Sequence, residues 1–137
     1  MIQLPWFPNE LRPNARPHFM AKSKATKKAR EWAFMATKAA QIFPPRDGPI
    51  RLIVGYYPKT RNALDMDNCI AASKAYFDGI AQALGVNDSR FVISPHIAEP
   101  VKGGRIIVEV VEQEARPIGE IIKPILSDIM QRVEKAA

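Results

Sequence analysis

Two aspartates one residue apart stand out because the chain around them is basic. In "TRNALDMDNC", which runs from Thr60 to Cys69, Asp65 and Asp67 are followed directly by Asn68. Two carboxylates at this spacing raise the cost of ionising each other unless a cation lies near them. Mg²⁺ is such a cation, and it usually takes one or two carboxylates together with substrate phosphate and water. The pair, beside basic residues, can therefore hold Mg²⁺ against a phosphate group.

The same two residues also have a purely structural interpretation. Aspartate is a favoured N-cap, and acidic side chains in a first turn interact well with the positive end of the helix dipole. On spacing alone, D-x-D-N is typical of a capped helix as well as of a metal site. Both interpretations stay open at this point.

The helix expected after this pair carries further charged residues. It should begin near Asp65, end at Leu84 and have Gly85 as its C-cap. At about 100° per residue, one face displays Asp67, Lys74 and Asp78. A different face gathers the apolar residues Cys69, Ile70, Phe77, Ile80 and Leu84. Asp88 comes just after the helix, so four carboxylates and a lysine accompany this one element.

Four apolar segments are typical of strands, and they define the rest of the domain. The expected strands are Ile2–Phe7, Ile50–Tyr57, an edge strand at Phe91–Ala98 and a last strand at Ile106–Glu112. The residues "KGGR" at 102–105 predict a hairpin turn into the last strand. The order β-α-β-α-β-β predicts a small α/β or α+β domain with a mixed sheet.

A long first helix is expected between the first two strands. Ser23 is the predicted cap, and the helix should run from Lys24 to Phe43, before two prolines. Apolar residues at helical spacing predict its core face: Trp32, Met35, Ala36, Ala39 and Phe43. Trp32 and Trp6 are both expected in the core rather than as stacking platforms for bases.

The last part of the chain differs from the rest. We divide the chain into a domain at 1–113 and a helical extension at 114–137. An apolar stripe at helical period marks the extension, and Pro124 should kink or restart its helix. The stripe consists of Ile118, Ile121, Ile122, Ile125, Ile129 and Val133.

Charge is distributed unevenly along the 137 residues. Residues 1–64 hold twelve Lys and Arg against three Asp and Glu, whereas residues 65–137 hold eight against eleven, and the net charge is +6. A basic half suggests a polyanionic partner, first of all nucleic acid, although a solvated basic face with no partner is equally compatible. The single cysteine, Cys69, is expected in the core and indicates a cytoplasmic protein. No apolar run is long enough to span a membrane.

Taken together, these motifs resemble the RusA family, the Holliday junction endodeoxyribonucleases of bacteria and their phages. The likeness covers residues 2 to about 113, and its motifs occur in the same order. They are "LPWFPN" near the start, "DMDN" at 65–68, "KAYFDGIAQAL" at 74–84, "NDSRF" at 87–91 and "KGGR" at 102–105. The resemblance implies a small α/β homodimer that needs Mg²⁺ and nicks two strands symmetrically across a four-way junction.

The resemblance also implies site residues. The family's three metal-binding and catalytic aspartates match Asp65, Asp67 and Asp88, and its catalytic lysine matches Lys74. In the best-known members the lysine follows the second aspartate by one helical turn. Here it follows by about two turns, and residue 71 is Ala. Lys74 nevertheless keeps the face of Asp67.

Partners follow from the same reasoning. Branched DNA should meet the basic half of the chain, and a twofold homodimer would match the twofold related strands of a junction, with the apolar stripe as a candidate contact. The expected phosphate contacts are Arg12, Arg16, Lys22, Lys24, Lys27, Lys28, Lys59 and Arg61. Two alternatives stay open: a non-catalytic nucleic-acid-binding protein with a capping acidic cluster, and an adaptor that works through its C-terminal helix.

Overall fold

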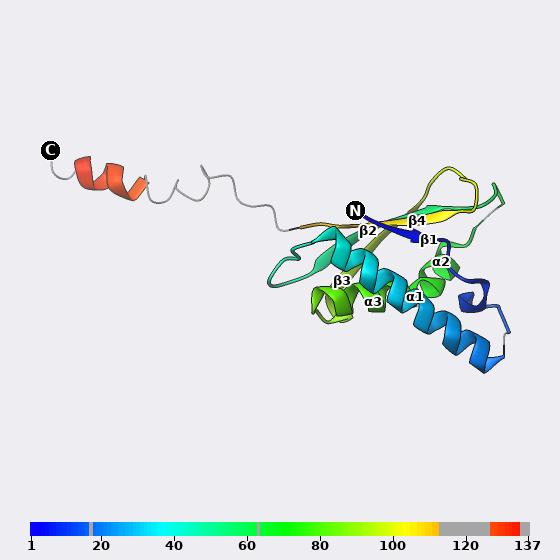
Figure 1. Cartoon of the computed structure of the whole chain (residues 1–137). Coiled ribbons are helices and arrows are strands. Elements are labelled where there is room, and N and C mark those ends of the chain that lie inside the picture. Colours follow the sequence, from blue (N-terminus) through cyan, green and yellow to red (C-terminus); the bar gives the residue numbers. More distant parts are fainter. Residues whose placement is uncertain (17, 63, 113–126, 135–137) are drawn as a thin grey trace.

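The computed structural model describes residues 1–16, 18–62, 64–112 and 127–134 (Figure 1). The predicted order of strands and helices is confirmed, with the second helix divided in two. The elements are β1 (Ile2–Pro5), η1 (Asn9–Leu11), α1 (Phe19–Ala40), β2 (Ile50–Tyr57), α2 (Met66–Ala72), α3 (Lys74–Leu84), η2 (Asp88–Arg90), β3 (Phe91–Ile97) and β4 (Arg105–Val110).

The four strands form one mixed sheet in the order β1-β4-β2-β3. Strand β4 is antiparallel to both β1 and β2, whereas β3 runs parallel to β2. Val54, at the middle of β2, lies opposite Val108 of β4 and Pro95 of β3. Pro95 therefore sits in an edge strand, where its missing N–H does no harm, as predicted.

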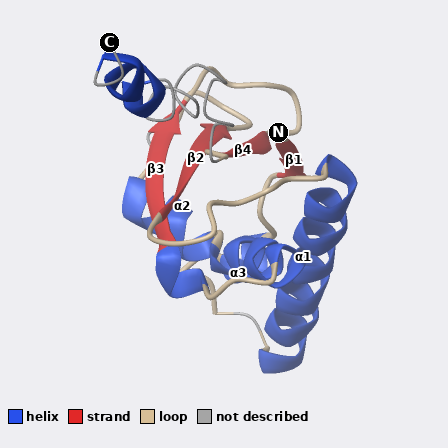
Figure 2. Cartoon of the chain, turned by 90° about the vertical axis from the view of Figure 1, so that its left-hand side faces the viewer, coloured by secondary structure: helices blue, strands red, loops and turns tan. Residues whose placement is uncertain are grey.

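Helices α1 and α3 cover one face of this sheet (Figure 2). Alternate residues of the strands point toward them, as the period of two requires. In β2, Ile50, Leu52, Val54 and Tyr56 are all fully buried on that side. The protein is thus a small α+β domain whose core lies between the sheet and two helices.

The prediction of a hairpin at residues 102–105 is wrong. The turn itself forms, because Gly103 and Gly104 adopt φ of 78° and 68° and the Gly104 amide donates to the carbonyl of Val101. However, β2 lies between β3 and β4 in the sheet, so the two strands that the turn joins are not neighbours. The two glycines determine that the chain turns here, but they do not determine which strand of the sheet the next strand pairs with.

The predicted start and end of the first helix are also wrong. α1 begins at Phe19, four residues before Ser23, and His18 is its cap, with the imidazole Nδ1 accepting from the Met20 amide at 3.3 Å. It ends at Ala40 rather than Phe43, because Gln41 adopts a left-handed conformation with φ of 51°.

The predicted core face of the first helix is wrong for two of its three large residues. Met35 and Phe43 are 70% and 78% exposed. The residues that α1 buries are instead small: Ala29, Ala33 and Thr37. They are small because α3 crosses α1 at Gly79, where a Cβ would lie 2.9 Å from that of Ala33 and would also meet the Arg30 carbonyl. Trp32 and Ala36 are partly buried against the core, and Ala39 is exposed.

The helix predicted from Asp65 to Leu84 is broken at Ser73. This residue is fully buried, with φ of −91° and ψ of −1°. Its hydroxyl donates to the Cys69 carbonyl at 2.7 Å and accepts from the Tyr56 hydroxyl at 3.0 Å. A strand of the sheet therefore holds the junction of α2 and α3 in place. The predicted C-cap is confirmed, since Gly85 has φ of 68°.

Part of the C-terminal prediction lies outside the described residues, namely Ile118, Ile121, Ile122, Pro124 and Ile125. Residues 127–134 are helical, as expected for that segment. Within them, Ile129 and Val133 are exposed. The division into two parts and the role of the stripe stay predictions.

Candidate functional site

The N-terminus of α2 positions the two aspartates of the D-x-D-N motif. Asp65 is the N-cap, and its Oδ1 accepts from the amides of Asp67 at 2.9 Å and Asn68 at 3.4 Å. Asp67 lies in the first turn and is exposed. Among the described residues, its carboxylate makes no hydrogen bond or ion pair. One carboxylate is thus fixed by the backbone, and the second projects beside it into solvent.

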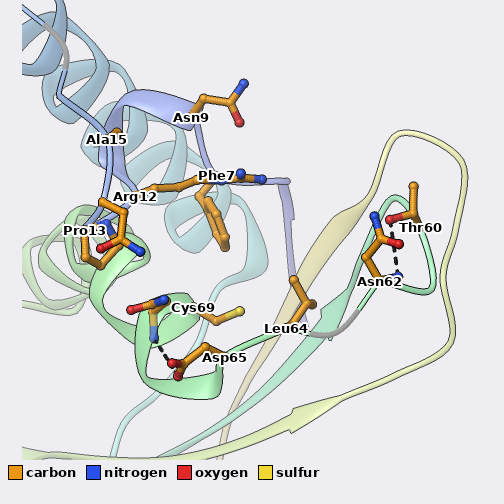
Figure 3. A pocket seen from close by; sticks show the side chains of 12 residues that line it. Phe7, Asn9, Arg12, Pro13, Ala15, Thr60, Asn62, Leu64, Asp65 and Cys69 are labelled. Atoms are coloured by element: carbon orange, nitrogen blue, oxygen red, sulfur yellow. Dashed lines mark hydrogen bonds between the residues drawn. The ribbon is translucent and has the colours of Figure 1, made fainter.

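A cleft of about 630 Å³ opens at this helix start (Figure 3). Its sides are α2, the arm that follows β1, and the connector between β2 and α2. The ring of Phe7 points into it, above Cys69 and Asp65. The lining residues are Phe7, Asn9, Arg12, Pro13, Asn14, Ala15, Thr60, Asn62, Leu64, Asp65, Asn68 and Cys69.

Charges of both signs act on this cleft. Burial raises the pKa of the Cys69 thiol, the negative charge of Asp65 raises it further, and the Arg12 guanidinium opposes both. Asp65 and Arg12 are therefore both close enough to Cys69 to act on it electrostatically. The thiol is buried and is held in its neutral form, so Cys69 is a core residue, as predicted. An arginine and a carboxylate that line the same cleft can together hold a phosphate beside a carboxylate-bound cation.

A second cleft, of about 410 Å³, lies along α1, α2 and α3 and shares Arg12 and Pro13 with the first. Lys74 and Asp78 of α3 line it, one helical turn apart. Lys22 of α1 lines the opposite side. The predicted lysine is therefore next to the aspartate cleft, separated from it by the arm that carries Arg12.

Asp88 lies against Asp78. The pKa of the Asp78 carboxyl is raised, first by burial and then by the charge of Asp88 and a hydrogen bond to it, while Lys74 and Arg30 act in the opposite direction. Asp88 therefore lies beside Asp78, on which Lys74 also acts, and it is not among the residues that line the cleft at Asp65. In the part of the chain that the structure describes, no group of three or more His, Cys, Asp or Glu side chains is placed to hold a metal ion.

The structure therefore divides the predicted site residues into two sets. Asp65 and Asp67 stand at the start of α2, whereas Lys74 at the start of α3 and Asp88 in η2 each act on Asp78 of α3. Asp78 is the residue that we did not include in the predicted site, although its spacing from Lys74 put both on one helix face. The break at Ser73, between the two sets, had no signal in the hydrophobic pattern.

All eight predicted phosphate contacts are exposed. Lys22 faces the second cleft, and Lys24, Lys27 and Lys28 lie along a separate groove beside α1. Arg61 pairs with Glu99 at 3.5 Å, and both side chains are more than 80% exposed. A pair that exposed contributes little to stability, so Arg61 can exchange its partner for a phosphate at small cost.

Comparison with known proteins bears on the family of this chain. No protein-family model matches the chain. A protein of Xylella fastidiosa (strain Temecula1 / ATCC 700964), whose name is "Uncharacterized protein", is 42% identical over 113 residues, which are 80% of this chain and 74% of the relative. No helix in the described residues has the length and apolar character needed to cross a membrane. An identity of 42% over most of both chains means that the protein belongs to the same family as this Xylella fastidiosa protein.

Proposed function

We propose that the protein is a Mg²⁺-dependent endodeoxyribonuclease that resolves Holliday junctions by paired symmetric nicks. The observation that carries the proposal is the placement of Asp65 and Asp67 at one helix start, beside a cleft that also presents Arg12. The resemblance to the RusA family in the order of its motifs supports the same activity.

The carboxylates at this helix start fit a magnesium ion. Asp65 directs one oxygen to the backbone of α2, which leaves its other oxygen for a ligand, and Asp67 is exposed beside it. Two carboxylates, completed by phosphate oxygens and water, are a usual set for Mg²⁺. When bound, the ion would activate a water molecule and stabilise the displaced oxygen. The resemblance implies Asp88 as a third ligand, but Asp88 lies against Asp78 in this structure, so the proposed ion is held by Asp65 and Asp67 and would gain Asp88 only if the segment after α3 moved.

The remaining residues bind and orient the DNA. Arg12 can hold a phosphate at the mouth of the aspartate cleft by two parallel hydrogen bonds. Lys74 is close enough to Asp78 to favour its charged form, and its ammonium can also stabilise charge on a leaving oxygen. A homodimer would present two such sites to the two related strands of a junction. The single cysteine is in keeping with a cytoplasmic location.

The test is nicking of a synthetic four-way junction, with and without Mg²⁺, by the wild type and by Asp67→Asn. The substitution keeps the shape of the side chain and removes the charge, so we expect nicking to fall by orders of magnitude while junction binding persists. Asp47→Asn is the matched control, because Asp47 is an exposed carboxylate on a loop away from both clefts. A folded Asp67→Asn protein that nicks at the wild-type rate would overturn the metal site.

A second candidate is favoured by the capping geometry. The two backbone contacts of Asp65 account for its presence without any metal. In that case the protein binds nucleic acid and does not cut it. The wild type would then bind the junction without Mg²⁺-dependent nicking, and Asp67→Asn would bind it somewhat more tightly because one repulsion against phosphate is lost.

A further inference from the structure

A further hollow lies beside α1 and shares no lining residue with the clefts at Asp65 and Lys74. This groove has a volume of about 770 Å³ and runs between the N-terminal half of α1 and the segment after β1. Its lining residues are Trp6, Pro8, Glu10, Ala21, Lys24, Ala25, Lys27, Lys28, Glu31 and Trp32. Neither part of the predicted nuclease site uses it.

Trp32 supplies the aromatic surface of the groove. Trp6 is only 7% exposed and packs on Phe7 with ring centroids 4.6 Å apart, so its role is in the core. Trp32 is partly buried against the core and faces the groove. The ammonium of Lys28 lies 4.8 Å from the Trp32 ring centroid. The interpretation of Trp32 as a core residue therefore accounts for only part of its surface.

The charges around the groove favour an anionic occupant. Lys24, Lys27 and Lys28 line it, against Glu10 and Glu31. Lysines beside an accessible aromatic ring are the usual construction of single-strand binding sites, because the ring stacks on any base and the ammonium groups follow the phosphates. An exposed cation–π contact is weak, so a base can take the place of the Lys28 ammonium on the ring. The displaced ammonium can then pair with the neighbouring phosphate.

We propose that this groove binds a single-stranded segment of nucleic acid, with one unpaired base stacked on Trp32 and the adjoining phosphates held by Lys24, Lys27 and Lys28. The proposal goes beyond the predicted phosphate contacts of these lysines, because it adds the recognition of an unpaired base by Trp32. It holds equally if the protein binds nucleic acid without cutting it.

The experiment measures binding of oligo(dT) in EDTA, so that nicking plays no part. Wild-type tryptophan fluorescence should be quenched as oligo(dT) binds, and a blunt duplex of equal charge should quench it much less. Trp32→Leu should weaken the binding of labelled oligo(dT) about 5- to 150-fold. Phe34→Leu is the matched control. Phe34 also lies on α1, and the ammonium of Lys38 lies 5.7 Å from its ring centroid, but Phe34 does not line the groove. That control should bind like the wild type.

A second variant, Lys28→Met, tests the proposal even if Trp32→Leu does not fold. Lys28→Met should leave the fold intact, and it should lower the slope of log K against log salt for oligo(dT) by about 0.7. Oligo(dT) binding at wild-type strength by a folded Trp32→Leu protein would overturn the proposal. It would also be overturned if the wild type bound oligo(dT) without quenching, or did not bind it, or if polyglutamate competed as well as the oligonucleotide.

Discussion

The buried hydroxyl pair at the junction of α2 and α3 can be tested by a double-mutant cycle. Tyr56→Phe removes the hydroxyl that donates to Ser73 at 3.0 Å, while Ser73 keeps its own bond to the Cys69 carbonyl. A neutral hydrogen bond contributes about 1 kcal/mol net, so we expect the variant to lose about that much free energy of unfolding. For a chain of this length, the melting temperature should fall by about 3–4 °C.

Ser73→Ala removes two contacts at once. The Tyr56 hydroxyl then has the Cys69 carbonyl as its remaining acceptor, at 3.4 Å. We expect a loss of about 1–2 kcal/mol, since a buried donor is left poorly satisfied. The double variant should be more stable than the sum of the single effects predicts, by about 0.5–1 kcal/mol, because the shared bond is lost only once.

Urea unfolding, followed by circular dichroism, measures all four proteins of the cycle. Effects that add to within about 0.3 kcal/mol would refute the hydrogen bond between the two hydroxyls. The pH dependence provides a second readout. Burial raises the pKa of Tyr56 to about 12. Its contribution to stability should therefore be complete below pH 10 and be lost as the pH rises toward 12, and Tyr56→Phe should lack this loss.

Three further predictions concern other positions. Gly79→Ala should cost about 1–3 kcal/mol despite its better helix propensity, because the added Cβ meets Arg30 and Ala33 of α1; an unchanged urea midpoint would contradict this. Asp78→Asn should raise the melting temperature at pH 7 but not at pH 3, since a raised pKa makes the wild type lose stability as the carboxyl ionises; lower stability at pH 7 would oppose this. Asp65→Ala should lose about 0.5–2 kcal/mol of unfolding free energy and Asp65→Asn little. Equal melting temperatures for the two variants would exclude Asp65 as the cap.

The sequence by itself determined the features that depend on neighbouring residues. The order of strands and helices, the helix start at Asp65 and the C-cap at Gly85 were all predictable. Caps and turns are made by side chains and backbone groups a few residues apart, so their signals are contained in short stretches. The apolar, β-branched residues of β2 likewise favour a strand through their own conformational preferences.

The candidate site was predictable only in part. Residue types and spacing singled out Asp65, Asp67 and Lys74, and the resemblance assigned their roles, which stay predictions; Asp65 and Lys74 line the two clefts. The placement of Asp88 against Asp78 depends on where the chain goes after α3 ends. Arg12 comes near Asp65 only because the arm after β1 folds back over α2. Contacts of this kind join residues far apart in sequence, and no local pattern encodes them.

Tertiary structure also decided which residues of α1 face the core. Hydrophobicity favoured Met35, which is exposed, whereas the residues that α1 buries fully beside α3 are the small Ala29, Ala33 and Thr37. Tertiary structure also decided the strand order, because β4 lies between β1 and β2 and not beside β3, which precedes it in the chain. A residue's side-chain type states what it can bury or bind. The packing of whole helices and strands decides which surface that side chain contacts, because their volumes must fit together at close packing.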